Sequence, residues 1–79
     1  MMPAPRELLM RQASRDGRPV AVLRAVDHGD GCVVEAEVYP AGGAPAVRPG
    51  PYAFADARQA AAFVSEVADA LMYLGCDLS

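Results

Sequence analysis

One short segment groups the residue types that could perform acid–base or metal chemistry. His28, the single histidine, lies between Asp27 and Asp30 in the segment Asp27–Gly31. A metal site needs three or four ligands that converge from fixed positions, and one His between two Asp in a tight turn does not supply them. Asp and Gly are also the residues that a β-turn requires. We therefore interpret this segment as a turn, and we predict no catalytic residue, no metal and no cofactor.

The remaining nucleophiles and the glycine-rich segment lack the partners that their chemistry requires. No Gly-x-Ser-x-Gly motif surrounds a serine. Residues 41–44, Ala-Gly-Gly-Ala, lack the Lys and Ser/Thr of a phosphate-binding loop and lead into Pro45. Cys32 and Cys76 form no Cys-x-x-Cys pattern, which indicates structural thiols, with a metal or redox pair as the alternative. The sequence thus predicts a non-enzymatic protein, with a small enzyme that uses His28, Asp27 and Asp30 as a further alternative.

Two arginines are candidate anion contacts near the start of a predicted C-terminal helix. Arg58 falls in the first turn of that helix, where free N–H groups and the helix dipole attract anions. Arg48 lies on the loop that leads there. Asp56, at the cap position between them, would oppose such a ligand. Arg48 and Arg58 remain the predicted anion contacts.

The basic residues are concentrated near the N-terminus. Residues 1–24 hold five Arg against two acids, and residues 25–79 hold two Arg against eight acids. Arg15 and Arg18 flank the dipeptide Asp16-Gly17 and could contact a phosphate backbone, while Tyr39 and Tyr52 could stack on bases. Nucleic-acid binding through this arginine-rich hairpin is therefore the alternative function. The net charge of −3 disfavours it, because such affinity comes largely from neutralising phosphates.

The strongest structural signal is an amphipathic helix predicted over residues 57–74. Its apolar residues recur with the three-four spacing of one helix face. Asp56 is a favourable N-cap, and Gln59 three residues later gives a pattern similar to a capping box. Gly75 supplies the left-handed residue that ends many helices. Such a helix needs a surface to cover.

That surface is predicted to be an antiparallel sheet of three or four strands. Residues 32–39 alternate in the manner of a strand, and residues 19–26 form a second one across the Asp27–Gly31 turn. Asp16-Gly17 predicts a hairpin that pairs residues 8–14 with residues 19–25. Residues 7–13 could instead be helical, because Glu7–Gln12 is good helix-forming sequence.

The remaining segments complete an α+β domain that spans residues 1–79. Residues 1–6 are predicted to be disordered. Residues 40–50, with three Pro and three Gly, are predicted to form a loop. Residues 52–54 are expected to add a short edge strand before the helix.

The hairpin register predicts which side chains lie on each face of the sheet. A two-residue turn at Asp16-Gly17 places Met10 opposite Leu23 and Leu8 opposite Ala25. The helix-facing set would then comprise Leu8, Met10, Ala21, Leu23, Ala25, Cys32, Val34, Ala36 and Val38. The open face, which is the candidate interface, would comprise Leu9, Arg11, Val20, Val22, Arg24, Val26, Val33, Glu35, Glu37 and Tyr39.

This predicted open face is more apolar than a solvated face needs to be. We expect it to be buried by a second copy of the chain or by another protein. Arg11 and Arg24 beside Glu35 and Glu37 would suit a self-complementary, two-fold interface. The alternative is a solvated face on which these residues form cross-strand Arg/Glu pairs.

Length and composition limit the remaining possibilities. A chain of 79 residues has room for one core, and a domain of this size buries only about 60 to 65% of its unfolded surface. The first ten residues contain no apolar run long enough for a signal peptide. Glu66 and Asp69 interrupt the helix, which argues against a membrane span. We therefore expect a cytoplasmic protein that forms a homodimer or binds a protein partner.

Overall fold

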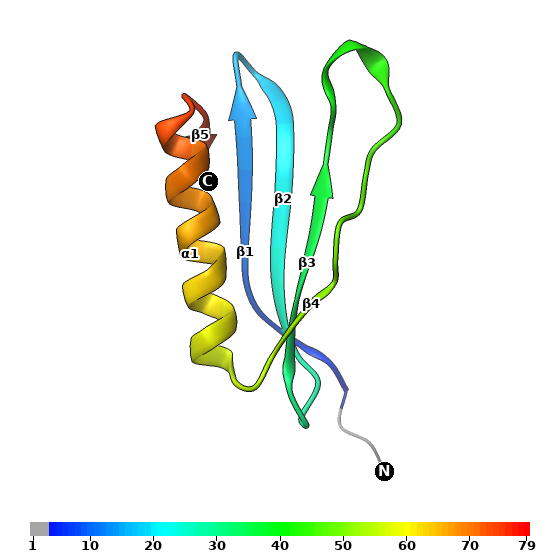
Figure 1. Cartoon of the computed structure of the whole chain (residues 1–79), viewed down its shortest axis with the longest axis vertical. Coiled ribbons are helices and arrows are strands. Elements are labelled where there is room, and N and C mark those ends of the chain that lie inside the picture. The colour runs from blue at the N-terminus through cyan, green and yellow to red at the C-terminus, as the bar shows by residue number, and fades with distance from the viewer. Residues whose placement is uncertain (1–3) are drawn as a thin grey trace.

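A computed structural model describes residues 4–79, and it shows one sheet covered on one side by one helix (Figure 1). The five-stranded antiparallel sheet has the strand order β4-β3-β2-β1-β5. The predicted α+β fold is confirmed, and the short strand β5 is an addition to it. The elements are β1 (Arg6–Arg15), β2 (Arg18–Asp27), β3 (Cys32–Val38), the 3₁₀ turn η1 (Ala41–Gly43), β4 (Tyr52–Phe54), α1 (Ala57–Tyr73) and β5 (Asp77–Leu78).

Helix α1 begins and ends at the signals that predicted it. The carboxylate of Asp56 accepts a hydrogen bond of 2.9 Å from the backbone N–H of Gln59. The side chain of Gln59 in turn accepts one from the N–H of Ala55, just before the cap, at 3.2 Å. Gly75 has a φ of 95°, and the N–H of Cys76 donates to the carbonyl of Leu71, as in a Schellman motif.

The β1–β2 hairpin has the predicted two-residue turn but not the predicted register. Asp16 and Gly17 both have positive φ, 53° and 77°, and Arg15 pairs with Arg18. The register then shifts by one residue between Ala13 and Ser14, which leaves Val20 as the extra residue of a β-bulge. Pro19 lies directly at this shift, and a proline has no N–H to donate to the ladder.

The bulge corrects the predicted faces of β1. Met10 pairs with Arg24 and therefore lies on the open face, where 43% of it is exposed, whereas it was predicted to face the helix. Leu9 and Arg11 pair with Ala25 and Leu23, so these two predicted open-face residues lie on the helix side instead. The shift moves the side chains of residues 9–13 to the opposite faces, and a second shift between Glu7 and Leu9 returns Glu7 to the open face.

The core between the sheet and α1 is small and is built mainly from small residues. Val34 and Val64 are the largest side chains that are fully buried. Ala60 and Ala68 bring the helix close to the sheet, which presents Ala25 at 0% exposure beneath it. Phe63 adds bulk at one side, where its ring lies 5.1 Å from that of Tyr52 and 5.2 Å from that of Phe54. A core of this size leaves a modest margin of stability.

The molecule is elongated, with extents of 44 × 24 × 16 Å. Its radius of gyration is 13.3 Å, whereas a compact chain of this length would have about 12 Å. Its accessible surface is 5536 Å², several hundred Å² more than the value of about 4600 Å² expected for a monomer of 8.3 kDa. The fold therefore exposes more surface than a self-sufficient monomer of its mass usually does.

Two other segments differ in detail from the prediction. Disorder was predicted for residues 1–6; residues 1–3 lie outside the described part of the chain, and Arg6 is the first residue of β1. The 40–50 loop contains η1, and Val47 then returns to pair with Val38 beside β3. Within residues 4–79, α1 is neither long nor apolar enough to traverse a bilayer.

Candidate interaction surface

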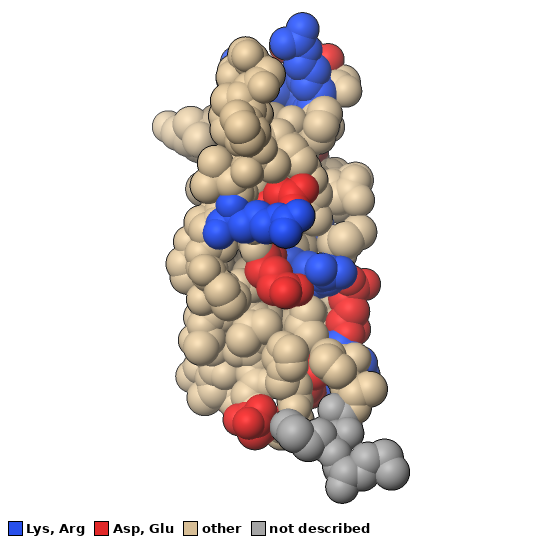
Figure 2. Space-filling view, turned by 90° about the vertical axis from the view of Figure 1, so that its right-hand side faces the viewer, with Lys and Arg blue, Asp and Glu red and all other residues tan. Residues whose placement is uncertain are grey.

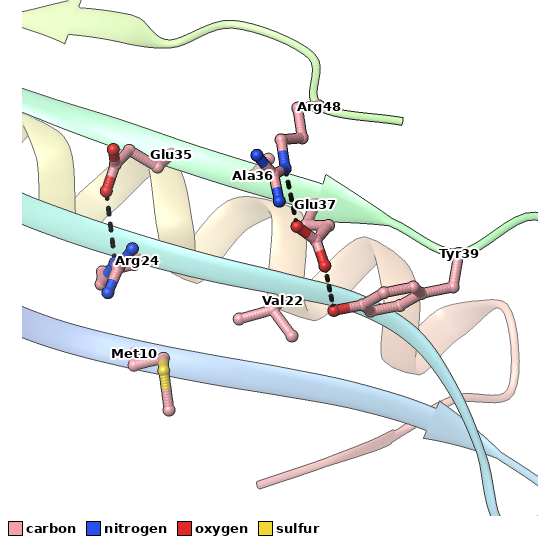
Figure 3. Close-up of a pocket in the computed structure, with 8 residues that line it drawn as sticks. All are labelled: Met10, Val22, Arg24, Glu35, Ala36, Glu37, Tyr39 and Arg48. Carbon is pink, nitrogen blue, oxygen red and sulfur yellow. Dashed lines mark hydrogen bonds and ion pairs between the residues drawn. The ribbon is translucent and has the colours of Figure 1, made fainter. Parts of the chain in front are cut away.

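The face of the sheet that α1 leaves uncovered carries a shallow hollow of about 340 Å³. Figure 3 shows that it is formed by side chains from β1, β2, β3 and the loop before β4. Basic and acidic side chains gather in the middle of this face and are surrounded by other residues (Figure 2). The hollow is lined by Met10, Val22, Arg24, Glu35, Ala36, Glu37, Tyr39 and Arg48.

One group of charges on this face crosses three strands. Arg24 on β2 lies 3.2 Å from a carboxylate oxygen of Glu35 on β3 and 3.8 Å from one of Glu7 on β1. About half of each of these three side chains is exposed, with values of 49% for Arg24 and 51% for both acids. Exposed pairs of this kind contribute about 0 to 1 kcal/mol each, so they neutralise the face more than they stabilise the fold.

A second group joins β3 to the loop that follows it. The Nε of Arg48 donates to Glu37 at 2.8 Å, and the hydroxyl of Tyr39 donates to the other oxygen of the same carboxylate (Figure 3). The bond from Tyr39, and then the bond from Arg48, lowers the pKa of Glu37. The same bond to Glu37 raises the pKa of Tyr39, because it stabilises the protonated phenol. The ring of Tyr39 is thereby held at the edge of the hollow.

The structure places most of the predicted interface residues on this face. Seven of the ten are there: Val22, Arg24, Val26, Val33, Glu35, Glu37 and Tyr39. Leu9 and Arg11 are on the helix side, and Val20 is displaced by the bulge. Of the predicted Arg/Glu pairs, Arg24 with Glu35 is formed, whereas the Nε of Arg11 donates instead to the carbonyl of Ser79 at 3.3 Å.

Three of the residues that line the hollow were not in the predicted open-face set, namely Met10, Ala36 and Arg48. Met10 was assigned to the wrong face because the hairpin was extended without a bulge; Pro19, directly after the turn, was the signal that could have indicated one. Arg48 was placed on a loop, and its pairing with Glu37 depends on the bridge that Val47 makes to Val38. No sequence pattern indicates that bridge.

The two predicted anion contacts are not brought together. The guanidinium of Arg48 is engaged by Glu37 on the open face, although 81% of its side chain is exposed. Arg58 is exposed in the first turn of α1, and the neighbouring cap is occupied by the carboxylate of Asp56. These positions provide no common anion site.

The segment around His28 has the structure of a turn. The N–H of His28 donates to the carbonyl of Gly31 at 2.9 Å, and that of Gly29 donates to the Asp27 carboxylate at 2.8 Å. Burial, and then the nearby Asp27, raises the pKa of the Cys32 thiol, which disfavours the nucleophilic thiolate. Within residues 4–79, no three His, Cys, Asp or Glu side chains are grouped in a way that could hold a metal ion.

The arginines of the N-terminal hairpin do not form a continuous basic surface. Arg6 lies 3.4 Å from the carboxylate of Asp27, Arg24 is paired with two acids, and Arg11 bonds a carbonyl. Arg15 and Arg18, at the turn, have no carboxylate within 4.0 Å in the described part of the chain. The basic character of this region is therefore confined to the hairpin tip.

A separate apolar groove of about 190 Å³ lies on the helix side, between α1 and the sheet. Phe63, Val67 and Leu71 of the helix form one wall, and Val38 and Tyr52 lie opposite them. The end of α1 and the residue that follows it also expose apolar side chains, namely Met72 at 52%, Tyr73 at 92% and Leu74 at 64%. This second surface could also bind a partner, so a test of the open face needs a control variant on it.

We compared the chain with protein-family models, with curated proteins and with solved structures, and none of them matches it.

Proposed function

We propose that this protein is a small non-enzymatic interaction module that associates with a second copy of itself through the open face of its sheet. The observation that carries the proposal is the hollow rimmed by Met10, Arg24, Tyr39 and Arg48. Met, Tyr and Arg are the side chains enriched at protein interfaces. The charged side chains of this face are already paired within the chain. A partner can therefore cover the face without burying an unpaired charge.

The size of the exposed surface supports the burial of one face by a partner. A standard interface removes about 800 Å² from each partner, which is of the same order as the surface that this chain exposes beyond a compact monomer. The small core gives an energetic reason for the same arrangement, since domains of this size commonly gain stability by association.

The charges of the face are also self-complementary. Arg48 keeps 81% of its side chain exposed, and Glu35 keeps 51%. In a two-fold arrangement, Arg48 of each copy can reach the Glu35 of the other, so that one kind of contact is made twice.

We propose a cytoplasmic setting for this module. Cys32 and Cys76 are both free in the structure, and Cys32 is buried in the core. Unpaired structural thiols are typical of a reducing compartment.

The test is the mass in solution of two matched variants. Met10→Asp adds a carboxylate to the open face, whereas Met72→Asp adds one to the exposed end of α1. Sedimentation equilibrium at high micromolar concentration should give twice 8.3 kDa for the wild type and for Met72→Asp, and the monomer mass for Met10→Asp. A monomeric wild type, or dissociation caused by Met72→Asp alone, would overturn the proposal.

A further inference from the structure

A second hollow, of about 710 Å³, lies between the β1–β2 turn and the loop that follows β3. One wall is the hairpin tip with Arg15, Asp16 and Arg18, and the opposite wall is residues 40–43. Tyr39 lines this hollow as well as the one on the open face, so the two adjoin at its ring. Small-molecule sites commonly have volumes of about 300 to 1000 Å³.

The two arginines at the tip are an unfavourable pair in the chain by itself. Arg15 and Arg18 are directly opposite each other in the antiparallel ladder, where like charges destabilise the pairing. Neither has a carboxylate within 4.0 Å among residues 4–79, in contrast to Arg6, Arg24 and Arg48. A bound anion between the two guanidinium groups would remove this repulsion.

The chemistry of the hollow fits a phosphate attached to an organic group. Guanidinium groups bind phosphate oxygens through paired, charge-assisted hydrogen bonds. Tyr39 offers an aromatic surface, and its hydroxyl is anchored to Glu37, which fixes the position of the ring. Asp16 lines the same hollow, and its carboxylate would repel an anion. The phosphate must therefore lie closer to Arg15 and Arg18 than to Asp16.

The opposite wall leaves space for such a ligand. Gly42 and Gly43 have φ of 79° and 76°, and no atom lies within 4 Å of the position that a Cβ would take at either residue. The wall is therefore free of side chains at these two positions.

We propose that this hollow binds a phosphate-bearing small molecule of nucleotide size, with Arg15 and Arg18 holding the phosphate and Tyr39 flanking the organic group. The site adjoins the self-association surface proposed above at the ring of Tyr39, but its arginines and residues 40–43 do not line the hollow on the open face.

Titrations of the full chain with AMP, adenosine and inorganic phosphate, followed by amide NMR, test the site. AMP should shift the signals of residues 15–18 and 39–43, phosphate should shift those of the hairpin tip, and adenosine should bind at least tenfold more weakly than AMP. Absence of any shift at millimolar AMP, or equal binding of adenosine and AMP, would overturn the proposal.

Matched variants separate a built site from general electrostatic attraction. Arg18→Gln and Arg58→Gln remove the same charge, one inside the hollow and one in the first turn of α1. Arg18→Gln should weaken AMP binding about tenfold, the loss expected for one charge-assisted hydrogen bond, and Arg58→Gln should leave it unchanged. Equal weakening by both variants would contradict the site.

An oligonucleotide identifies the source of the phosphate. If a short single-stranded oligonucleotide binds more tightly than AMP and Arg18→Gln weakens it, the phosphate at the site belongs to a nucleic acid. If AMP binds as tightly as the oligonucleotide, the ligand is a free nucleotide or a molecule like it.

Discussion

The two sides of strand β2 show how one strand is divided between folding and recognition. On the helix side, Ala21, Leu23 and Ala25 are all buried, and the two alanines let α1 approach the sheet. On the opposite side, Arg24 is half exposed and bridges two acids from neighbouring strands. We therefore expect the helix side to supply most of the folding free energy, and changes at the exposed residues of the open side to have little effect on the fold.

The largest expected difference between the two sides comes from truncating one apolar side chain on each. Leu23→Ala should reduce the free energy of unfolding by about 3 kcal/mol, because it leaves a cavity beneath α1. Met10→Ala should cost less than about 1 kcal/mol, since Met10 is 43% exposed. Urea denaturation at low protein concentration, followed by circular dichroism, measures both. Equal losses would contradict the placement of Met10 on the open face.

A smaller effect should follow from loosening the end of the helix that covers the sheet. Asp56→Ala removes the acceptor of the Gln59 N–H and should lower the free energy of unfolding by about 1 kcal/mol. Asp69→Ala, on the exposed surface of α1, is the control and should change it by less than about 0.5 kcal/mol. If the two variants lose the same stability, the cap is not the reason that the helix begins at Ala57.

The charges of the open face should matter still less for stability. Arg24→Gln breaks contacts with Glu7 and Glu35, yet it should cost less than about 1 kcal/mol, because all three side chains are about half exposed. Thermal unfolding in low and high salt measures this contribution, which added salt should reduce further. A loss comparable to that of Leu23→Ala would mean that the open face also holds the fold together.

The smallest effect concerns the titration of Glu37 and Tyr39. The pKa of Glu37 is lowered on folding, so its contribution to stability is present above its ordinary pKa of 4.5 and is lost as the pH falls through the lower folded value. The pKa of Tyr39 is raised, so its contribution is present below 10.0 and is lost as the pH rises through the higher folded value.

Glu37→Gln provides the check on that titration. It removes the carboxylate that accepts from Tyr39 and should therefore lower the pKa of Tyr39 toward its ordinary value. Ultraviolet absorbance of the tyrosinate measures the change. An unchanged titration would show that the bond to Glu37 does not form in solution.

The elements fixed by local signals were predictable from the sequence. Helix α1 was expected over residues 57–74 and spans Ala57–Tyr73, because Asp56 and Gly75 act on neighbouring backbone groups. The Asp16-Gly17 turn was predicted for the same reason, since both residues adopt positive φ readily.

Features that depend on distant parts of the chain were not predictable. The face that Met10 occupies depends on a bulge beside Pro19. Strand β5 has two residues and exists because it pairs with Ala13 and Ser14, more than sixty positions away in the sequence. The pairing of Arg48 with Glu37 likewise requires the loop to return along β3. Met10 and Arg48 were therefore recognised as parts of the hollow on the open face only in the folded chain.

The most direct test of the open face as the self-association surface is a dilution series followed by amide NMR of the wild-type chain. We predict that signals of Met10, Val22, Arg24, Glu35 and Glu37 shift between micromolar and millimolar concentration, while those of residues 72–74 stay constant. Shifts confined to residues 72–74 and the helix-side groove, or no concentration dependence at all, would contradict the account.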